Sequence, residues 1–359
     1  MTIRNPPTRR DVLTLAAATA VTGAAWPWTR PAHAAAPEPT RITPELIAAA
    51  TKEARVNYYT SVDLPVAEKL AKAFEAKFPG IAVKVERSGA ERNYQRLGQE
   101  YASKIYNCDT INSSDAAHFI VWKRDGLLEP LVPEDVAKHY APEFKDADGT
   151  HATWRIMLSV IAYNTRLVKP EEAPKSFADL LDPKWTSKMV KAHPGYSGTI
   201  MTATHQMSRD LGWEYFEKLA KQKIMQVQSA ADPPKKLILG ERAVMVDGAD
   251  YPIYGMKDKG EPIEVVYAVE GTPLITGPSA VMKRAPNPNA AKLFHCWSFT
   301  EEAQQLAVDV GGLRSAHALV RERKGRKPLA EIKLMKENAA EVEKLADEIK
   351  TKYAALFKV

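Results

Sequence analysis

From Val56 onward, short apolar runs alternate with amphipathic stretches, and this alternation constrains the fold more than any other feature of the sequence. Residues 56–60 and 81–85 have the composition of strands, and residues 64–78 between them repeat apolar side chains every four positions, as one face of a helix does. The pattern continues as a helix, a strand and a helix over residues 93–103, 109–112 and 116–123. Such alternation predicts βαβ units and a mostly parallel sheet.

A second α/β unit is predicted in the middle of the chain. Its strands are expected at residues 159–164, 189–192 and 243–247, with helices at 199–211 and 213–220. Apolar residues step by three and four along residues 329–357, which predicts one long C-terminal helix. The charged remainder of that helix favours a single stripe packed on its own domain over a coiled-coil seam.

The first 34 residues have the three parts of a cleaved export signal. Arg9-Arg10 is followed by the uncharged stretch 12–25 and then by the small-x-small site Ala32-His33-Ala34. The uncharged stretch is shorter than the roughly 20 residues that a membrane span needs. The paired arginines resemble a twin-arginine signal, although Val12 stands where that signal usually has Phe, and an ordinary secretory signal is the alternative. The mature protein is therefore expected in the periplasm.

Composition excludes some classes of protein. The formal net charge is +6, but four arginines and one aspartate lie within residues 1–34, which leaves about +3 for the remainder. No basic run is interleaved with aromatic residues, so a nucleic-acid partner is not expected. Cys108 and Cys296 each have apolar neighbours, which favours buried thiols over a disulfide. No GxGxxG, P-loop, HExxH or GxSxG motif occurs, so the motifs give no support for an enzyme.

Polar residues gather where predicted strands end, which is where α/β sheets bind ligands. The candidates are Thr60, Ser61, Asp63, Arg87, Ser88, Ser113, Ser114, Asp115, Asp250 and Tyr251. Ser and Asp are also preferred helix N-caps, so Asp63, Ser114 and Asp115 have a structural alternative. Ser197-Gly198-Thr199 precedes a predicted helix, and its N–H groups and hydroxyls suit an anion.

Several segments, in this order, resemble the ferric-ion-binding cluster of type II periplasmic solute-binding proteins, whose members also take phosphonates, thiamine and polyamines. They are residues 56–60, 78–81, 109–115, 126–130, 162–165, 179–185 and 286–291. The resemblance covers about residues 56–313. It implies two α/β lobes joined by crossing strands, with the ligand clamped between the lobes by hinge closure.

On this resemblance the chain divides into five parts. They are the export signal 1–34, a tether 35–43, lobe 1 at 44–159 with roughly 275–320 returning to it, lobe 2 at 160–274, and a C-terminal helical segment 321–359 packed on the lobes. Tyr163 would lie at the first crossing, and residues 267–280 would hold the return. The partner would be the membrane permease of an ABC importer, and the chain is expected to be a monomer.

Ferric binders of this family hold iron with two adjacent tyrosines, a histidine, a glutamate and an anion. The tyrosine pair falls on Asp250-Tyr251, the histidine on Asp63, and the acidic position on Ser114 beside Asp115. The anion motif is retained at Ser197-Gly198-Thr199, but the metal set is altered. Asp63, Asp115, Asp250 and Tyr251 could form a hard oxygen site for a cation, or they could bind an organic solute.

The leading interpretation is therefore a non-enzymatic solute-binding component of an ABC importer that takes a small polar or anionic solute without a cofactor. Ferric ion with a synergistic anion is the first alternative. An extracytoplasmic sensor subunit or an exported enzyme on the same fold is the second.

Overall fold

Two mixed β-sheets organise residues 36–359, which are the residues that this computed structural model describes. The predicted export signal, residues 1–34, lies outside them. The first sheet has the order β12-β11-β3-β1-β2, and β4 and β5 also pair with β11. Its strands are β1 (Arg55–Thr60), β2 (Ala82–Arg87), β3 (Thr110–Asn112), β4 (Leu128–Glu129), β5 (Ala152–Leu158), β11 (Thr272–Met282) and β12 (Leu334–Met335).

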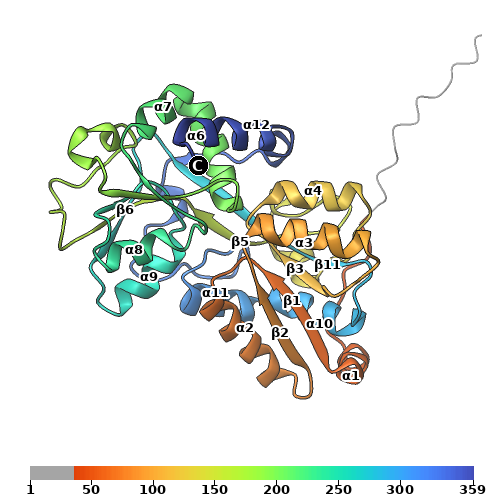
Figure 1. Cartoon of the computed structure of the whole chain (residues 1–359). Coiled ribbons are helices and arrows are strands. Elements are labelled where there is room, and N and C mark those ends of the chain that lie inside the picture. Colours follow the sequence, from red (N-terminus) through yellow and green to blue (C-terminus); the bar gives the residue numbers. More distant parts are fainter. Residues whose placement is uncertain (1–35) are drawn as a thin grey trace, which may run out of the picture. The chain divides into compact units, whose positions relative to one another are not determined.

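The second sheet has the order β10-β6-β9-β7-β8. Its strands are β6 (Ile161–Asn164), β7 (Met189–Ala192), β8 (Met225–Val227), β9 (Val244–Met245) and β10 (Ile263–Val266). We call the elements around the first sheet lobe 1 and those around the second sheet lobe 2 (Figure 1). The α/β class predicted from the alternation is confirmed: β1 pairs in parallel with both β2 and β3, and β7 pairs in parallel with β8 and β9. The expectation of mostly parallel sheets is corrected, because β11 pairs antiparallel with β3, β4 and β5, and β6 pairs antiparallel with β9 and β10.

Helices cover both sheets. Those of lobe 1 are α1 (Pro44–Glu53), α2 (Leu64–Lys77), α3 (Ala90–Ala102), α4 (Ala116–Arg124), α5 (Glu134–His139), α10 (Pro288–Ser298) and α11 (Glu301–Gly311). Those of lobe 2 are α6 (Gly198–Leu211), α7 (Trp213–Ala220), α8 (Pro233–Ile238) and α9 (Tyr251–Asp258). Short 3-10 turns occupy Pro142–Phe144, Ala178–Leu181, Pro183–Trp185 and Leu329–Glu331. Within residues 36–359, no helix combines the length and the apolar character that crossing a membrane requires.

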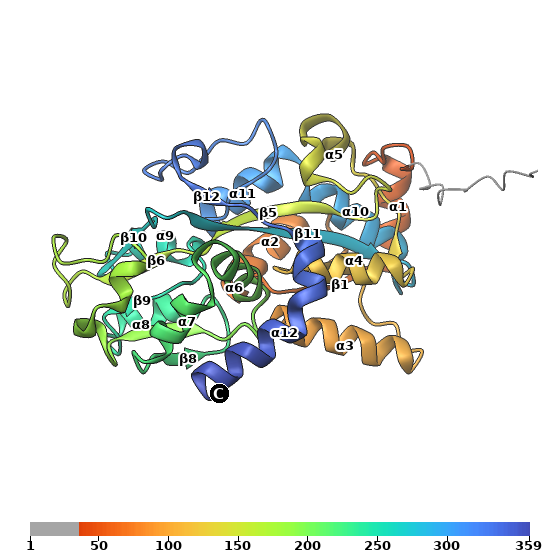
Figure 2. The same cartoon turned by 90° about the horizontal axis from the view of Figure 1, so that it is seen from above.

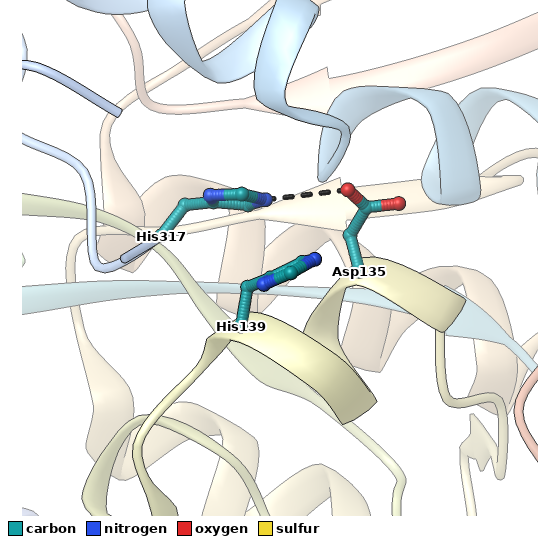
Figure 3. A group of neighbouring side chains, drawn as sticks. All are labelled: Asp135, His139 and His317. Atoms are coloured by element: carbon teal, nitrogen blue, oxygen red, sulfur yellow. Dashed lines mark hydrogen bonds and ion pairs between the residues drawn. The ribbon is translucent and has the colours of Figure 1, made fainter. Parts of the chain in front are cut away.

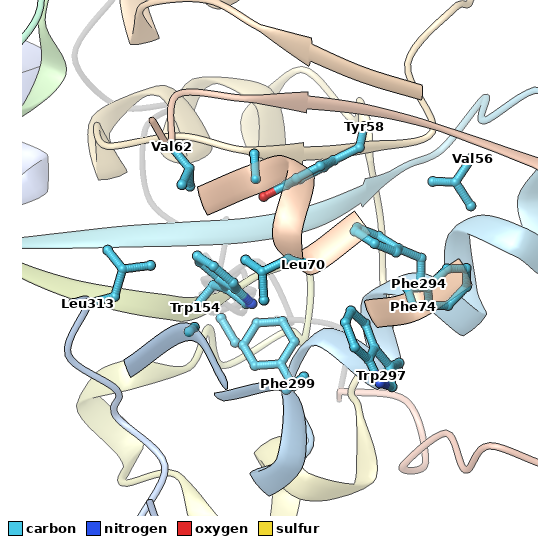
Figure 4. Packing of buried hydrophobic residues seen from close by; sticks show 14 of the residues in the cluster. Val56, Tyr58, Val62, Leu70, Phe74, Trp154, Phe294, Trp297, Phe299 and Leu313 are labelled. Carbon is cyan, nitrogen blue, oxygen red and sulfur yellow. The ribbon is translucent and has the colours of Figure 1, made fainter. Parts of the chain in front are cut away.

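The core of lobe 1 shows why the four-residue spacing of α2 matters. Phe74, which is fully buried on α2, contacts the rings of Phe294 and Trp297 on α10 at centroid distances of 5.1 and 5.3 Å (Figure 4). Tyr58 of β1 packs on Phe294 from the sheet side at 5.0 Å. Edge-on aromatic pairs of this kind stabilise a core beyond their buried area. These contacts fix α2 and α10 against β1. The residue after the carboxyl end of β1, Ser61, lines the cavity described below.

The chain passes between the sheets twice. It leaves β5 at Leu158 and enters β6 at Ile161, so the first crossing is Ser159–Val160 and not Tyr163, which already lies within the second sheet. It returns between Val266 and Thr272, after which β11 pairs antiparallel with β5. Tyr163 is 5% exposed and packs in the apolar core of lobe 2. The prediction that Tyr163 lies at the crossing is therefore wrong, because the crossing ends at Val160, before β6 begins.

The C-terminal segment also differs from the expected single helix. Residues 334–335 form β12, which pairs in parallel with Thr272 and Pro273 of β11, and α12 begins only at Ala339 and runs to Phe357. This edge strand lies in the segment whose apolar spacing predicts the first turns of the helix. Asn338 then caps α12 by accepting a hydrogen bond from the Glu341 amide. α12 packs against α4 of lobe 1 and against α6 and α7 of lobe 2 (Figure 2).

Cys108 and Cys296 are both free and buried. The preference for buried thiols over a disulfide is thus confirmed.

Candidate ligand-binding cleft

A cavity lies between the two lobes at the carboxyl ends of their strands, with about 330 Å³ of unoccupied space including its mouth. Lobe 1 lines it with Ser61, Arg87, Gly89, Ala90, Ser114, Arg155 and Met157. Lobe 2 lines it with Tyr196, Ser197, Thr199, Ser229, Ala230, Ala231, Ala249 and Tyr251. Ser61, Arg87 and Ser114 follow or end β1, β2 and β3, so the parallel register of these strands brings them to one edge. This is where ligands collect in open α/β sheets.

Two arginines give the cavity its charge. Arg155 of β5 is 1% exposed and donates to the side-chain amide oxygen of Asn112 (2.7 Å) and to the Ser61 hydroxyl (2.9 Å). Arg87 of β2 donates across the cleft to the Ser229 hydroxyl of lobe 2 (2.9 Å). These partners are neutral, and none of the described residues that line the cavity is acidic. The two positive charges therefore lack a lining counter-charge.

The electrostatics of these arginines favour an anion. Burial lowers the pKa of Arg155, and nearby Arg87 lowers it further. Among the described residues, the Nε atoms of both arginines are buried without a hydrogen-bond partner. Unpaired buried donors and like charges both destabilise an empty site. An anion would satisfy the donors and the charge together.

Helix N-termini add backbone donors to the same space. Ser197 caps α6, its hydroxyl accepting from the Ile200 amide at 3.4 Å, and Thr199 follows in the first turn. Gly89 precedes α3, and no side chain caps the first amides of that helix. Free N–H groups and the helix dipole make such N-termini favourable for negative charge.

Tyr251 of α9 reaches the cavity from lobe 2. Its hydroxyl accepts a hydrogen bond from the Asp63 amide of lobe 1 at 3.1 Å, so it bridges the lobes. Burial raises the pKa of Tyr251, whereas Arg155 lowers it. The side chain is thus a neutral phenol at neutral pH, with an oxygen that remains available at the cavity wall.

Of the fourteen residues predicted for the site, six line the cavity: Ser61, Arg87, Ser114, Ser197, Thr199 and Tyr251. Gly198 and Asp115 are each adjacent in sequence to lining residues, and the two approach each other closely. Thr60 accepts from the Val62 amide within lobe 1, and Ser113 is fully buried behind the strand ends. Ser88 follows Arg87, its amide donating to the Thr60 carbonyl.

Asp250 does not face the cleft, contrary to the expectation from the resemblance. It is fully buried; one carboxylate oxygen accepts from the Leu158 amide (3.1 Å) and the other from Arg326. Arg314 also lies 3.8 Å from it. These two arginines come from the segment after α11, which sequence spacing could not place here. Asp250 therefore holds that segment to the end of β5.

The four proposed metal ligands do not form one oxygen cluster. Asp115 caps α4 through the Ala117 amide (3.0 Å), Asp63 lies 3.5 Å from Lys235, and Asp250 is held by Arg326. Of the four, only Tyr251 lines the cavity. The residue types fit an anion better than a cation, because the lining donors are guanidinium, hydroxyl and amide groups.

Sequence reasoning missed two polar residues of the cavity lining, Arg155 and Ser229. Arg155 carried a signal, since it is the one charged residue in the otherwise apolar and neutral strand 152–158. A buried charge in a strand that crosses toward the second lobe is a candidate ligand contact. Ser229 has no comparable local signal.

The fold is that of a two-lobed protein, and the cavity between the lobes is its candidate ligand site. The family model described as "Bacterial extracellular solute-binding protein" matches residues 69–327. The chain belongs to this family, whose description places its members outside the cytoplasm.

Solved structures agree on the fold. The periplasmic binding protein AfuA from Actinobacillus pleuropneumoniae, with exogenous fructose-6-phosphate bound, has a TM-score of 0.77 at 23% identity, covering 85% of this chain and 99% of that one. Iron-bound HitA from Pseudomonas aeruginosa has a TM-score of 0.72 at 23% identity, covering 84% and 99%. The two-lobed periplasmic binding fold predicted from the sequence is confirmed.

A relative from Sinorhizobium fredii, named "Probable ABC transporter periplasmic-binding protein y4fP", is 24% identical over 235 residues, or 63% of this chain. The first two curated relatives are matched over 56% and 64% of their own lengths.

Proposed function

We propose that the protein is the periplasmic solute-binding component of an ABC importer and that it captures a small solute with a phosphate or phosphonate group. The observation that carries this proposal is the pair of arginines, Arg87 and Arg155, held on neutral partners in a cavity whose described lining residues include no acid. Guanidinium groups match the geometry of tetrahedral oxyanions. Family membership and the name of the S. fredii relative support the importer role, with a membrane permease as partner.

Closure of the two lobes around a ligand would produce the conformation that the permease recognises. Arg87 with Ser229, and Tyr251 with Asp63, are hydrogen bonds between the lobes at the cavity. A ligand that contacts both sides would strengthen the closed arrangement, because it binds that arrangement better than an open one. Affinity and closure then suffice, and no chemical step is required of the protein.

Ferric ion with an anion is the second candidate, favoured by the iron-bound state of HitA and by Tyr251 in the cavity wall. The carboxylates that would complete such a site are engaged elsewhere, which makes an anionic solute the better match. A ferric site with one tyrosine would show a visible charge-transfer band that Tyr251→Phe removes.

The test is a thermal-shift and calorimetric screen of the mature protein. Inorganic phosphate, methylphosphonate, fructose-6-phosphate, spermidine, citrate and ferric chloride with carbonate serve as probes. A phosphate or phosphonate probe at about one hundred times its Kd should add about 2.7 kcal/mol to the free energy of unfolding. A response to spermidine alone, or a visible ferric band lost in Tyr251→Phe, would contradict the anion proposal. Turnover of any probe would instead indicate an exported enzyme.

Export by the twin-arginine route belongs to the same proposal. Replacing Arg9 and Arg10 with lysine should prevent the protein from reaching the periplasm. Unchanged periplasmic amounts of the double variant would indicate the ordinary secretory route.

A further inference from the structure

A group of metal-binding side chains lies on lobe 1 among residues that do not line the cleft cavity. Asp135 and His139 lie four positions apart on α5, which places them on the same helical face. His317 comes from the segment after α11 (Figure 3). Within the described part of the chain, these three residues bring two imidazole nitrogens and one carboxylate oxygen within 4.8 Å of one another.

We propose that Asp135, His139 and His317 form a binding site for a divalent transition-metal ion. Two imidazoles and one carboxylate are a ligand set that suits Zn²⁺ and its neighbours, Co²⁺ and Ni²⁺, and three protein ligands leave a position open for water. The proposal concerns a different part of lobe 1 from the cleft and does not depend on which solute the cleft takes.

The most buried ligand is already held in place. The Nε2 atom of His317 lies 3.2 Å from the Asp135 carboxylate, and its ring lies 5.0 Å from the ring of His139. The Tyr140 ring lies nearly perpendicular to the same imidazole at a centroid distance of 5.6 Å. The Ala318 amide donates to the His139 carbonyl at 3.0 Å, which joins the His317 segment to the end of α5. The two backbones that carry the ligands are therefore fixed relative to each other.

The hydrogen bonds of the two His317 ring nitrogens distinguish the metal-free protein from the metal-bound one. The Leu319 amide donates to Nδ1 of His317 at 3.2 Å, so the metal-free imidazole carries its proton on Nε2 and donates it to Asp135. Coordination through Nε2 moves the proton to Nδ1, and the Leu319 amide must then turn away. Leu319 is 52% exposed in a turn, so its amide can pair with water.

The three ligands need only small movements to close on an ion. Metal–ligand bonds near 2.0–2.2 Å require donor atoms closer together than 4.8 Å. Asp135 and His139 are only partly buried, so their side chains can rotate toward His317. The bound ion would join the segment after α11 to α5 and thereby stabilise lobe 1.

The experiment titrates the full mature protein, stripped with a chelator, with Zn²⁺ by calorimetry and with Co²⁺ by visible absorption. We expect one ion per chain, Co²⁺ bands typical of low coordination number, and a raised Tm. His139→Ala should weaken Zn²⁺ binding at least tenfold, and this partly exposed position should tolerate the change. Lys138→Ala, on the exposed side of the same helix, is the matched control and should bind as the parent does.

A second measurement separates this site from any metal bound elsewhere. The amide NMR signal of Leu319 should shift on Zn²⁺ addition in the parent and in Lys138→Ala, but not in His139→Ala. Asp135→Asn provides a further variant with the carboxylate replaced. If His139→Ala and Asp135→Asn bind Zn²⁺ as tightly as the parent, the proposal is wrong. It is also wrong if the parent binds no Zn²⁺ at about 10⁻⁴ M metal, which is the tighter end of the Kd range of extracellular Ca²⁺ modules.

Discussion

Gly198 of lobe 2 lies so close to Asp115 of lobe 1 that a methyl group at position 198 would be 2.5 Å from the Asp115 Cβ. The same methyl group would lie 3.0 Å from the Ala90 Cβ and from the Ser114 carbonyl oxygen. The start of α6 therefore meets the starts of α3 and α4 across the cleft, and only glycine permits that approach. Gly89 has the corresponding position on the other side, where a methyl group would lie 2.9 Å from the Tyr196 carbonyl oxygen.

Gly198→Ala should therefore hold the lobes apart without damaging either one. We expect affinity for an anionic probe to fall at least tenfold, about 1.4 kcal/mol or more, because the clash arises only in the closed arrangement. Small-angle scattering should show a larger radius of gyration than in the parent. Gly98→Ala is the control, because a methyl group there has no atom within 4 Å. Equal affinity in the parent and Gly198→Ala would mean that the site does not need this contact.

Arg155→Met should separate ligand affinity from stability. Removal of a buried charge that pairs with the ligand typically costs about 2–5 kcal/mol of binding free energy. The ligand-free protein should lose little, because the change removes one of two like charges that have no acidic neighbour among the cavity residues of the described part of the chain, 36–359. Calorimetry and the Tm without ligand check both parts, with the exposed Arg166→Met as control. A large fall in the ligand-free Tm together with unchanged anion affinity would assign Arg155 a structural role only.

Glu91 should make the protein sensitive to acid. Its pKa is lowered to about 2: burial opposes this shift, while the hydrogen bond from His118 and the charge of Lys350 on α12 cause it. Because the folded-state pKa lies below the unfolded value, the stabilisation is present above about pH 4.5 and is lost as the pH falls toward 2. Glu91→Gln should flatten the Tm between pH 5 and pH 2. If the Tm falls equally with pH in the parent and in Glu91→Gln, Glu91 does not contribute to acid unfolding.

Glu337 should make the protein less stable as the pH rises, whereas Glu91 makes it less stable as the pH falls. Its carboxylate accepts from the amide (3.0 Å) and the hydroxyl (2.5 Å) of Thr276 on β11, and burial raises its pKa to about 7. A raised pKa for an acid means that folding favours the protonated form, so stability falls as the pH rises from about 4.5 through 7. Glu337→Gln should therefore raise the Tm at pH 8 more than at pH 5. A larger gain at pH 5 would contradict the assignment.

The contacts of α12 with both lobes predict how the lobes separate from each other. Glu343 and Lys350 pair with Arg124 (3.0 Å) and Glu91 (3.1 Å) of lobe 1, and the Tyr353 hydroxyl donates to Gln226 (3.0 Å) of lobe 2. A helix attached to both lobes must detach from one of them when they separate. Lys350→Glu, which faces Glu91, should favour the open arrangement and increase the off-rate of a bound probe. Lys344→Glu, an exposed position on the same helix, is the control.

The sequence by itself determined the features that depend on local order. The alternation of β1, α2 and β2 follows from apolar periodicity, and the polar residues after strands follow from the geometry of parallel sheets. Ser61, Arg87, Ser114 and Ser197 could therefore be selected from the order of residues alone. The family resemblance also depends on local motifs.

The tertiary structure decided what depends on contacts between distant segments. Asp250 and Tyr251 are adjacent, yet Arg326 draws the first into a buried ion pair while the second reaches the cavity. Residues 334–335 became a strand because β11 offered an unpaired edge, which outweighed their helical spacing. Arg155 faces Ser61 from 94 positions away. Such pairings are set by how the lobes pack, and neither propensity nor periodicity within a segment contains that information.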